Sequence, residues 1–249
     1  MSEEIELQLL KEIEELKSRL AKFENSQVDI TPTYNYSKIT FETLNSIVKI
    51  EAIDDKNIFQ KWFDADIKLD SDILFFLQEL LNKEGAYLRY YYEEDLKAKF
   101  IIPILNKINF TLIDKKIKDF YEAKLTYKSD KFTLTGTVDY IVSKGLRYNE
   151  KPYFFIQEFK KTIEVSDPEP QLLAELISAV ELNDFKEIKG AYIIGSIWNF
   201  VVLERLERHK YIYYISQNFD STKPEDLKAI YKNLLFVKLE IIEKVEKEI

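Results

Sequence analysis

The sequence predicts an α/β fold in which a mixed central sheet is flanked by helices. Up to about residue 106 and again after residue 168, apolar residues recur at spacings of three and four, the period of amphipathic helices. Between about residues 118 and 143 the period changes to two, which is typical of strands. Residues 153–159 are almost wholly apolar, and this pattern indicates a strand that is buried on both faces of a sheet.

The composition limits the chemistry that the protein can perform. With 249 residues, 46% of them hydrophobic, the chain can form one main domain with helical appendages. It contains no Cys and one His, so a Cys/His zinc site, a Cys nucleophile and disulfides are excluded. Any metal would therefore be held by oxygen ligands. The sequence has no Walker-type or dinucleotide-binding glycine motif.

Charge and hydropathy bear on location and partners. No apolar run approaches the roughly 20 residues that cross a bilayer, and the acidic start MSEEIE is unlike a signal peptide. We therefore expect no membrane association and a cytoplasmic protein. The net charge of −8 argues against a surface that binds nucleic acid as a whole. Local contacts to phosphate remain open, because 36 Lys and Arg residues can form a patch.

Both ends of the chain are predicted to be helices that resemble short coiled coils. The C-terminal helix occupies residues 221–249, with Ser221 or Thr222 as its cap, and its apolar seam can receive the N-terminal helix from the same chain or from a second copy. The N-terminal helix either packs on its own domain or forms an arm of a homodimer. It occupies residues 1–26, with a seam of apolar residues at alternating spacings of four and three: Leu9, Ile13, Leu16, Leu20 and Phe23.

Between these helices, residues 27–86 are predicted as a lead-in region and residues 87–220 as the core. In the lead-in region, helices are predicted over residues 57–64 and 70–84, whereas residues 37–55 fit either a helix or a pair of strands.

The core is predicted to begin with a helix over residues 93–106 that bends at Pro103. Glu93 and Glu94 lie in its first turn. Acidic side chains there complement the helix dipole, so a purely structural reading of the two residues remains open.

The next segment is predicted to be a hairpin that turns at Ser129–Asp130. Its second strand, residues 131–143, places Asp139 on a face with three Thr hydroxyl groups. The opposite face is predicted to carry Phe132, Leu134, Val138 and Tyr140.

A polar loop leads to the buried strand, residues 152–160, on which Glu158 and Lys160 share one face. Burying a charged group costs several kcal/mol, at least about 3, unless it is paired or bound. These two charges are therefore either a surface ion pair at the strand end or part of a site.

A helix that starts near Pro168 follows, with Gln171 and Glu175 on one side of it. A solvated helix face and a role at the site both fit this pair. Strands are predicted over residues 189–194, 197–206 and 210–216, and His209, in the turn between the last two, is typical of a solvated surface residue.

Asp139, Glu158 and Lys160 suit one kind of chemistry if the strand ends bring them together. Two carboxylates a few ångströms apart are the ligands that Mg²⁺ prefers, and bound Mg²⁺ can acidify a water and neutralise phosphate charge. Lys160 can orient or deprotonate that water and stabilise the charge of the transition state. Phosphodiester hydrolysis fits this set better than glycoside cleavage, in which the Lys has no task.

These residues resemble the PD-(D/E)XK, or restriction-endonuclease-like, nuclease superfamily, in which an Asp on one strand precedes a Glu-x-Lys at the end of the next. Asp139 and Glu158-Phe159-Lys160 fit the two parts, although Val138 replaces the usual Pro. The segments EEDLKAKFIIPIL and GSIWNFVVLE are similar to parts of the nuclease domain of type I restriction motor subunits.

The resemblance implies a restriction-endonuclease-like sheet and further site residues. A Glu on the preceding helix and a Gln on the following helix are common in the family. Glu93 is our first choice for that Glu, with Glu94 as the alternative, and Gln171 lies at the place of the Gln. Glu93, Asp139 and Glu158 are then the expected metal ligands.

The sequence thus predicts a nuclease that hydrolyses phosphodiester bonds with Mg²⁺, for which Mn²⁺ can substitute. DNA is the expected substrate more than RNA. The alternative is a nuclease-like fold without activity that serves as a binding or oligomerisation module.

Overall fold

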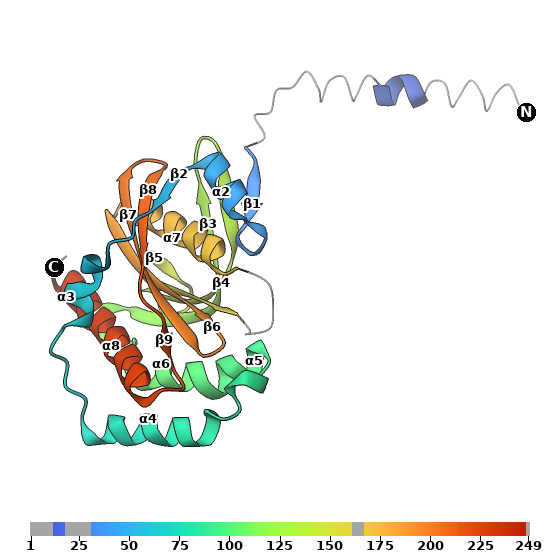
Figure 1. Ribbon diagram of the computed structural model, residues 1–249. Helices are drawn as coiled ribbons and strands as arrows, with labels where there is room; N and C mark the ends of the chain where they lie inside the picture. Colours follow the sequence, from blue (N-terminus) through green and yellow to red (C-terminus); the bar gives the residue numbers. More distant parts are fainter. Residues whose placement is uncertain (1–11, 18–30, 161–166, 248–249) are drawn as a thin grey trace, which may run out of the picture. The chain divides into compact units, whose positions relative to one another are not determined.

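The computed structural model describes residues 12–17, 31–160 and 167–247 of the chain (Figure 1). The chain divides into two units, residues 1–32 and residues 33–249. In the first unit, residues 12–17 are helical. Leu9, Leu20 and Phe23 of the predicted seam lie outside the described residues, so the coiled coil at this end stays a prediction.

The second unit is built on one nine-stranded sheet with the order β1-β4-β5-β6-β7-β8-β2, in which β3 also pairs with β4 and β9 with β7. The pairs β3–β4 and β4–β5 are antiparallel and β5–β6 is parallel, so the sheet is mixed, as predicted. The strands are β1 (Thr33–Asn35), β2 (Lys49–Ala52), β3 (Ile117–Lys128), β4 (Thr133–Lys144), β5 (Glu150–Lys160), β6 (Glu187–Ile194), β7 (Ile197–Glu207), β8 (Lys210–Ile215) and β9 (Phe219–Asp220).

The helices lie where the apolar periodicity predicts them. Asp70 caps α4, because its side chain accepts a hydrogen bond of 2.8 Å from the backbone N–H of Ile73. Within the part of the chain that the structure describes, no helix combines the length and the apolar character needed to cross a bilayer. The helices are α2 (Phe41–Ile47), α3 (Gln60–Phe63), α4 (Ser71–Glu84), α5 (Glu93–Leu96), α6 (Ile102–Ile108), α7 (Glu169–Asn183) and α8 (Pro224–Lys247).

Two edges of the sheet come from the predicted lead-in region. β1 pairs in parallel with β4, and β2 pairs in parallel with β8. Residues 37–55, which fitted either a helix or strands, contain both: α2 is followed directly by β2.

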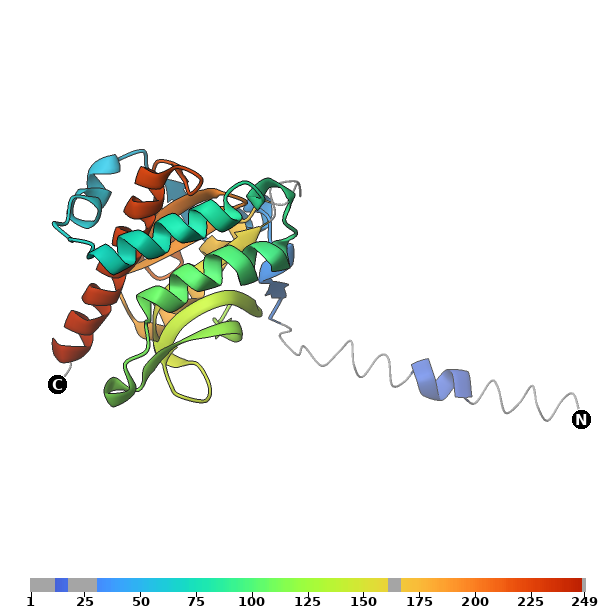
Figure 2. The ribbon, with the colours of Figure 1, turned by 90° about the horizontal axis from the view of Figure 1, so that it is seen from below.

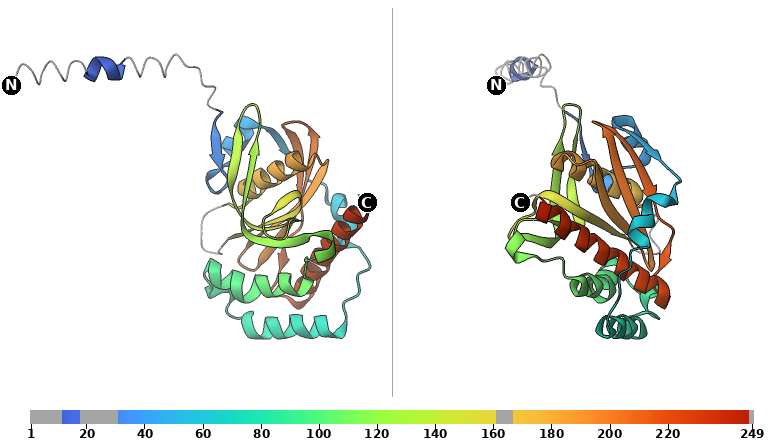
Figure 3. Two further views of the ribbon diagram at one scale, coloured as in Figure 1. Left: turned by 180° about the vertical axis from the view of Figure 1, so that it is seen from behind. Right: turned by 90° about the vertical axis from the view of Figure 1, so that its left-hand side faces the viewer.

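Helices cover both faces of the curled sheet, which confirms the predicted fold class (Figures 1 and 3). α7 packs on one face, with α2 beside it, whereas α3, α6 and α8 lie on the other, and α4 packs outside α8 (Figure 2). α7 is buried on almost every side, from Pro170 to Val180. It approaches β6 so closely that a Cβ at Gly190 would lie 3.0 Å from the side chain of Leu176.

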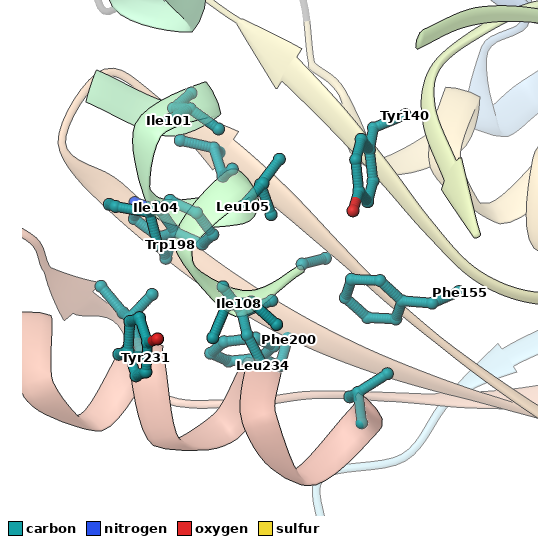
Figure 4. Packing of buried hydrophobic residues seen from close by; sticks show 14 of the residues in the cluster. Ile101, Ile104, Leu105, Ile108, Tyr140, Phe155, Trp198, Phe200, Tyr231 and Leu234 are labelled. Carbon is teal, nitrogen blue, oxygen red and sulfur yellow. The ribbon is translucent and has the colours of Figure 1, made fainter. Parts of the chain in front are cut away.

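Each face of the sheet has its own hydrophobic cluster. The cluster under α7 includes Leu134, Val138 and Ile156. The cluster under α6 and α8 is rich in aromatic residues, among them Phe155 and Trp198, and Figure 4 shows side chains of both helices meeting the sheet there.

The apolar seam of α8 is occupied by its own domain. Leu227, Ile230, Leu234, Val237 and Ile241 are all buried in the cluster under α6 and α8. The prediction that this seam receives the N-terminal helix, or a second copy of it, is therefore wrong.

The predicted cap of α8 is also wrong. The hydroxyl of Ser221 donates to the backbone oxygen of Ser196, and that of Thr222 donates to Asp220. Neither hydroxyl is therefore used to cap the helix, which begins after Lys223, whose carbonyl accepts from the N–H of Leu227.

β4 changes the side to which its residues point, and it does so at Asp139. Phe132, Leu134 and Val138 pack in the cluster under α7, as predicted for one strand face. Tyr140, predicted to share that face, packs instead in the opposite cluster (Figure 4), while Ile141 packs under α7. The alternation of β4 therefore slips by one residue between 138 and 141.

The helix predicted over residues 93–106 is interrupted, as expected from Pro103. The interruption is a wider, π-helical turn. Between α5 and α6, residues Lys97–Ile101 form a π-helix, in which the N–H of Ile102 donates to the carbonyl of Lys97. Pro103 has no N–H to donate, so the regular ladder cannot continue past it.

Candidate functional site

The candidate site lies where β4 and β5 separate. Their backbone pairing ends at Tyr140 and Gln157, although one more step in the same register would place Asp139 opposite Glu158. Instead, Asp139 Oδ2 accepts a hydrogen bond of 2.8 Å from the backbone N–H of Phe159. The carboxylate thus takes the place of a backbone acceptor and is fixed beside the end of β5.

Glu158 and Lys160 are in contact at the buried end of β5, as their predicted common face requires. Lys160 Nζ lies 2.7 Å from Glu158 Oε1, and the Glu158 side chain is 1% exposed. Glu158 Oε2 accepts no hydrogen bond from any described residue. The interpretation as a surface ion pair at the strand end is therefore wrong for these two residues.

Burial sets the protonation of this pair. Loss of solvation, together with the nearby Asp139 carboxylate, raises the pKa of Glu158 to about 8. Burial alone would lower the pKa of Lys160, but the Glu158 carboxylate outweighs it and raises that pKa. At neutral pH and without a metal, Glu158 is therefore mostly protonated and Lys160 is an ammonium. The ammonium suits Lys160 to orienting a water and stabilising negative charge rather than to deprotonating the water.

Glu93 reaches the site from α5 through a residue that the sequence did not single out. Lys97 Nζ lies 3.0 Å from Asp139 Oδ1 and 3.0 Å from Glu93 Oε1, and its side chain is 10% exposed. Glu94 is 3.8 Å from the same ammonium, and its side chain is 87% exposed. The geometry brings Glu93, our first choice, into the cluster and leaves Glu94 in solvent.

The charge of Lys97 is stabilised by these neighbours. Burial alone would lower its pKa, but Asp139 and then Glu93 outweigh that effect and raise it. The ammonium is therefore a permanent positive charge among the carboxylates.

Glu122 brings one more carboxylate to the cluster from β3. The register of β3 and β4 places it opposite Asp139, at the one position within that ladder where no backbone pair forms. Glu122 has a φ of +49°, a left-handed conformation that is uncommon for a residue other than glycine. Its Oε1 lies 3.6 Å from Lys97 Nζ. The Glu122 side chain is 64% exposed, and partial loss of solvation, followed by the Asp139 charge, raises its pKa.

α7 places Gln171 and Glu175 on the same side of the helix, as predicted. Gln171 Nε2 donates to Glu175 Oε1 over 3.1 Å. Glu175 is fully buried, and its Oε2 has no hydrogen-bond partner within the described residues. Burial, and then the charge of Glu158, raises the pKa of Glu175 well above its ordinary value. Glu175 thus lies within the field of Glu158, and Gln171 is bonded to Glu175. Both side chains are buried, so a solvated helix face is the wrong reading for both.

A cleft of about 440 Å³ opens beside Lys160 and Gln171. Its opposite wall is formed by residues 36–41, which include Lys38. Tyr36 anchors this wall, since its hydroxyl donates to Ser178 Oγ of α7 over 2.8 Å. A Cβ at Gly136 would lie 2.7 Å from the Tyr36 ring, which explains the glycine in β4.

The ligands available for a metal fit a hard cation in kind. Asp139, Glu158, Glu93 and Glu122 offer carboxylate oxygens only, which are the donors that Mg²⁺ and Mn²⁺ take. In residues 12–17, 31–160 and 167–247, no three acidic or His side chains lie close enough together to hold a metal as they stand. The Lys97 ammonium lies among Asp139, Glu93 and Glu122.

Lys97 and Glu122 were missed at the sequence level, although one of them left a signal. Lys97 follows Glu93 by four residues, the spacing at which a helix brings two side chains together. Glu122 left no such signal, because its position opposite Asp139 depends on the length of the hairpin turn.

Comparison with known proteins gives no family for the chain. No family model matches it, and no curated protein matches it. Among solved structures, a DrdV–DNA complex studied by cryo-electron microscopy is 13% identical, with a TM-score of 0.34, over 66% of this chain but 14% of the DrdV chain. The crystal structure of SSO0001 is 12% identical, with a TM-score of 0.21, over 72% of this chain and 84% of the other. Similarities of this size establish neither a family nor an activity.

Proposed function

We propose that the chain is a metal-dependent nuclease that hydrolyses phosphodiester bonds in nucleic acid, in DNA rather than RNA. One observation carries the proposal: the three residues expected to do the chemistry, Asp139, Glu158 and Lys160, lie together where β4 and β5 separate. A buried carboxylate with an unpartnered oxygen is costly for a fold to keep. That cost is understandable if the oxygen has a ligand during function.

Each residue has a task in this proposal. Asp139, Glu158 and Glu93 would hold Mg²⁺ or Mn²⁺, which when bound acidifies a water and neutralises charge on the phosphate. Lys160, held as an ammonium by Glu158, orients the attacking water and stabilises the negative charge that develops on the phosphate. Gln171 fixes the side chain of Glu175 beside Glu158.

Exposed aromatic residues beside the site support nucleic acid as the substrate. The segment before α5 presents Tyr87, Tyr90 and Tyr92 to solvent, and the last of these directly precedes Glu93. The Arg89 guanidinium lies 4.6 Å from the centre of the Tyr90 ring. Aromatic rings next to a cationic group are surfaces on which unpaired bases stack.

The segment is held by the residues between these rings. Leu88 is buried, and the Tyr91 hydroxyl donates to Glu84. Lys99 Nζ lies 4.9 Å from the centre of the Tyr91 ring. The exposed rings are therefore attached to a fixed backbone next to the site.

The test is cleavage of labelled single- and double-stranded DNA and RNA by the purified full chain with Mg²⁺, Mn²⁺ or EDTA. We expect cleavage that requires metal and falls at least about 100-fold in Lys160→Ala, because an electrostatic contact in a transition state is worth that much. The matched control is Lys228→Ala in α8, whose ammonium lies 2.7 Å from the exposed Glu225. It is expected to cleave as the unaltered chain does.

Circular dichroism shows whether Lys160→Ala remains folded. Metal-dependent cleavage that persists in a folded Lys160→Ala variant contradicts the role of Lys160. Absence of cleavage by the unaltered chain, on every substrate and with both metals, contradicts the nuclease.

One observation favours the second candidate, a nuclease-like fold that binds nucleic acid or a partner without cutting. The Lys97 ammonium already pairs with both Asp139 and Glu93, so each of these two carboxylates has a positive partner without a metal. This candidate predicts that the chain binds labelled DNA equally well in EDTA and in Mg²⁺, without cleavage. Binding that depends on metal argues against it.

A further inference from the structure

Lys97 holds the place where a divalent cation would neutralise the carboxylates of the site. Its ammonium lies 3.0 Å from Asp139 Oδ1, 3.0 Å from Glu93 Oε1 and 3.6 Å from Glu122 Oε1. These three oxygens come from α5, β3 and β4, so a helix and both strands of a hairpin converge on one positive charge. Such a cluster of like charges is repulsive without a cation at its centre.

The surroundings keep this ammonium in place. Lys97 is the first residue of the π-helix between α5 and α6, and its side chain is 10% exposed. Its Nζ also lies 5.8 Å from the centre of the Phe159 ring, on the strand that carries Glu158 and Lys160. The charge therefore sits over the end of β5, within the field of Glu158.

A metal ion cannot share this position with the ammonium. Both need the same oxygens of Asp139 and Glu93, and two cations at that separation repel each other strongly in a poorly solvated site. The unpartnered Oε2 of Glu158 is an independent sign that the cluster has a ligand still to gain.

We propose that Lys97 is an internal counter-cation that a divalent metal must displace, so that it sets the metal affinity of the site. The inference rests on the proposed function for the identity of the metal, and it adds Glu122 to the carboxylates that surround it. The long side chain of Lys97 can swing toward the exposed side of the cluster, where Glu94 lies 3.8 Å from its ammonium. The metal then gains Asp139 and Glu93, and the net charge of the site changes by one rather than two.

The test measures Mn²⁺ binding to the full chain by the electron paramagnetic resonance signal of free Mn²⁺, without nucleic acid. Lys97→Met removes the charge and keeps most of the volume of the side chain. We expect it to bind Mn²⁺ at least about tenfold more tightly than the unaltered chain, because the competing charge is gone. The matched control is Lys99→Met, which removes an ammonium from the same segment that pairs 2.8 Å from Asp95, and it is expected to bind Mn²⁺ as the unaltered chain does.

A second variant keeps the test decisive if Lys97→Met unfolds without metal. Lys97→Arg keeps the charge and forms stronger, two-pronged contacts with carboxylates, so we expect it to bind Mn²⁺ several-fold more weakly. Equal or weaker binding by a folded Lys97→Met variant overturns the inference, as does equal or tighter binding by Lys97→Arg.

These outcomes are separable from the nuclease assay. Tighter Mn²⁺ binding by Lys97→Met without cleavage of any substrate by the unaltered chain supports the inference and refutes the nuclease alone. Metal-dependent cleavage together with unchanged Mn²⁺ binding in both variants refutes the inference alone.

Discussion

Glu158 and Glu175 are carboxyl groups that lose their solvation when the chain folds. Each is almost completely buried, and each has an oxygen without a hydrogen-bond partner in the described part of the chain. Their raised pKa values mean that the folded state binds protons which the unfolded state releases near neutral pH. As the pH rises, these two groups therefore lower the free energy of unfolding.

This linkage predicts the effect of Glu158→Gln on stability. The pKa of Glu158 is raised from 4.5 to about 8, so its contribution to stability is fully present below pH 4.5 and is lost as the pH rises to about 8. Gln cannot ionise. In the absence of metal at pH 8.5, we expect Glu158→Gln to have a larger free energy of unfolding than the unaltered chain, by a few kcal/mol at most (about 1.4 per pKa unit). It should therefore unfold at a higher temperature.

Thermal unfolding between pH 4 and pH 9 measures this difference. Near pH 4 it is expected to be small, because the carboxyl group is neutral in both states. Glu94→Gln, at an exposed position on α5, serves as the control and should show no such pH dependence. A gain from Glu158→Gln that is equal at pH 4 and pH 9 would contradict the raised pKa.

Residue patterns predicted the centre of the site and missed its rim. The two-residue period identified Asp139 as a residue of the second hairpin strand, and the apolar run of β5 identified Glu158, although the alternation of β4 slips at Asp139 itself. Glu122 could not be predicted, because a hairpin turning at Ser129–Asp130 would place Asp139 opposite Phe120. The actual loop is longer, with Lys128 and Thr133 as the last pair, and this register places Asp139 opposite Glu122.

At the scale of elements, Pro103 shows what a breaker residue can and cannot predict. Its missing N–H dictates that the helix beginning at Glu93 is interrupted. It does not dictate how, and the chain inserts the π-helix Lys97–Ile101 instead of a kink or an end. Glu93 and Lys97 remain one helical turn apart across this junction, which is why their side chains meet.

The segment that leads into α5 carries its own prediction. If bases stack on Tyr87 and Tyr90, the double variant Tyr87→Ala/Tyr90→Ala loses about 1–3 kcal/mol of binding energy for each stacked base, or at least about fivefold in affinity. Fluorescence anisotropy with labelled single-stranded DNA, in Ca²⁺ to limit cleavage, measures the loss.

Phe75→Ala is the control for that measurement. Phe75 is an equally exposed aromatic residue on α4, outside the segment before α5. It should leave the affinity unchanged. Equal affinity of the double variant and the unaltered chain would show that the tyrosines do not contact the nucleic acid.

α8 shows that an apolar stripe predicts which face of a helix is buried, but not what buries it. The spacing of Leu227, Ile230, Leu234 and Val237 was read correctly as one face. The same spacing serves a coiled coil and a helix packed on a sheet, so the partner could not be predicted. In the structure the partner is the cluster that α8 shares with α6 and β7.

For the molecule as a whole, the division into two units predicts that the second unit, residues 33–249, folds without residues 1–32. Among the residues that the structure describes, both hydrophobic clusters lie within residues 33–249. Removing residues 1–30 is therefore expected to leave the melting temperature of the protein nearly unchanged, as measured by differential scanning calorimetry.

The matched control removes the same kind of element from the other end. A chain that stops at residue 236 lacks Val237, Ile241 and Val245, which are buried in the cluster under α6 and α8. It is expected to unfold at a much lower temperature, since each lost apolar side chain costs about 2–5 kcal/mol. A large drop on removing residues 1–30 would show that the first unit contributes to the fold.

The sequence predicted the class and the centre of the sheet better than its edges. β3 to β8 have long runs of alternating or apolar residues, joined by turns or by the α7 crossover, and these local signals are strong. β1 and β2 have three and four residues, and each pairs in parallel with a strand far away in the sequence. No local turn links such strands, so their pairing depends on the packing of the whole chain.

Because of the slip in β4, the position of Asp139 depends on the packing of both faces of the sheet. Val138 packs in the cluster under α7, and Tyr140 packs in the cluster under α6 and α8. Asp139, between them, is therefore bonded on each side to a residue of a different hydrophobic cluster. Close-packed interiors transmit small displacements rather than absorb them. Loosening either core therefore shifts the Asp139 carboxylate, so under the proposed function cleavage would fall before the chain unfolds.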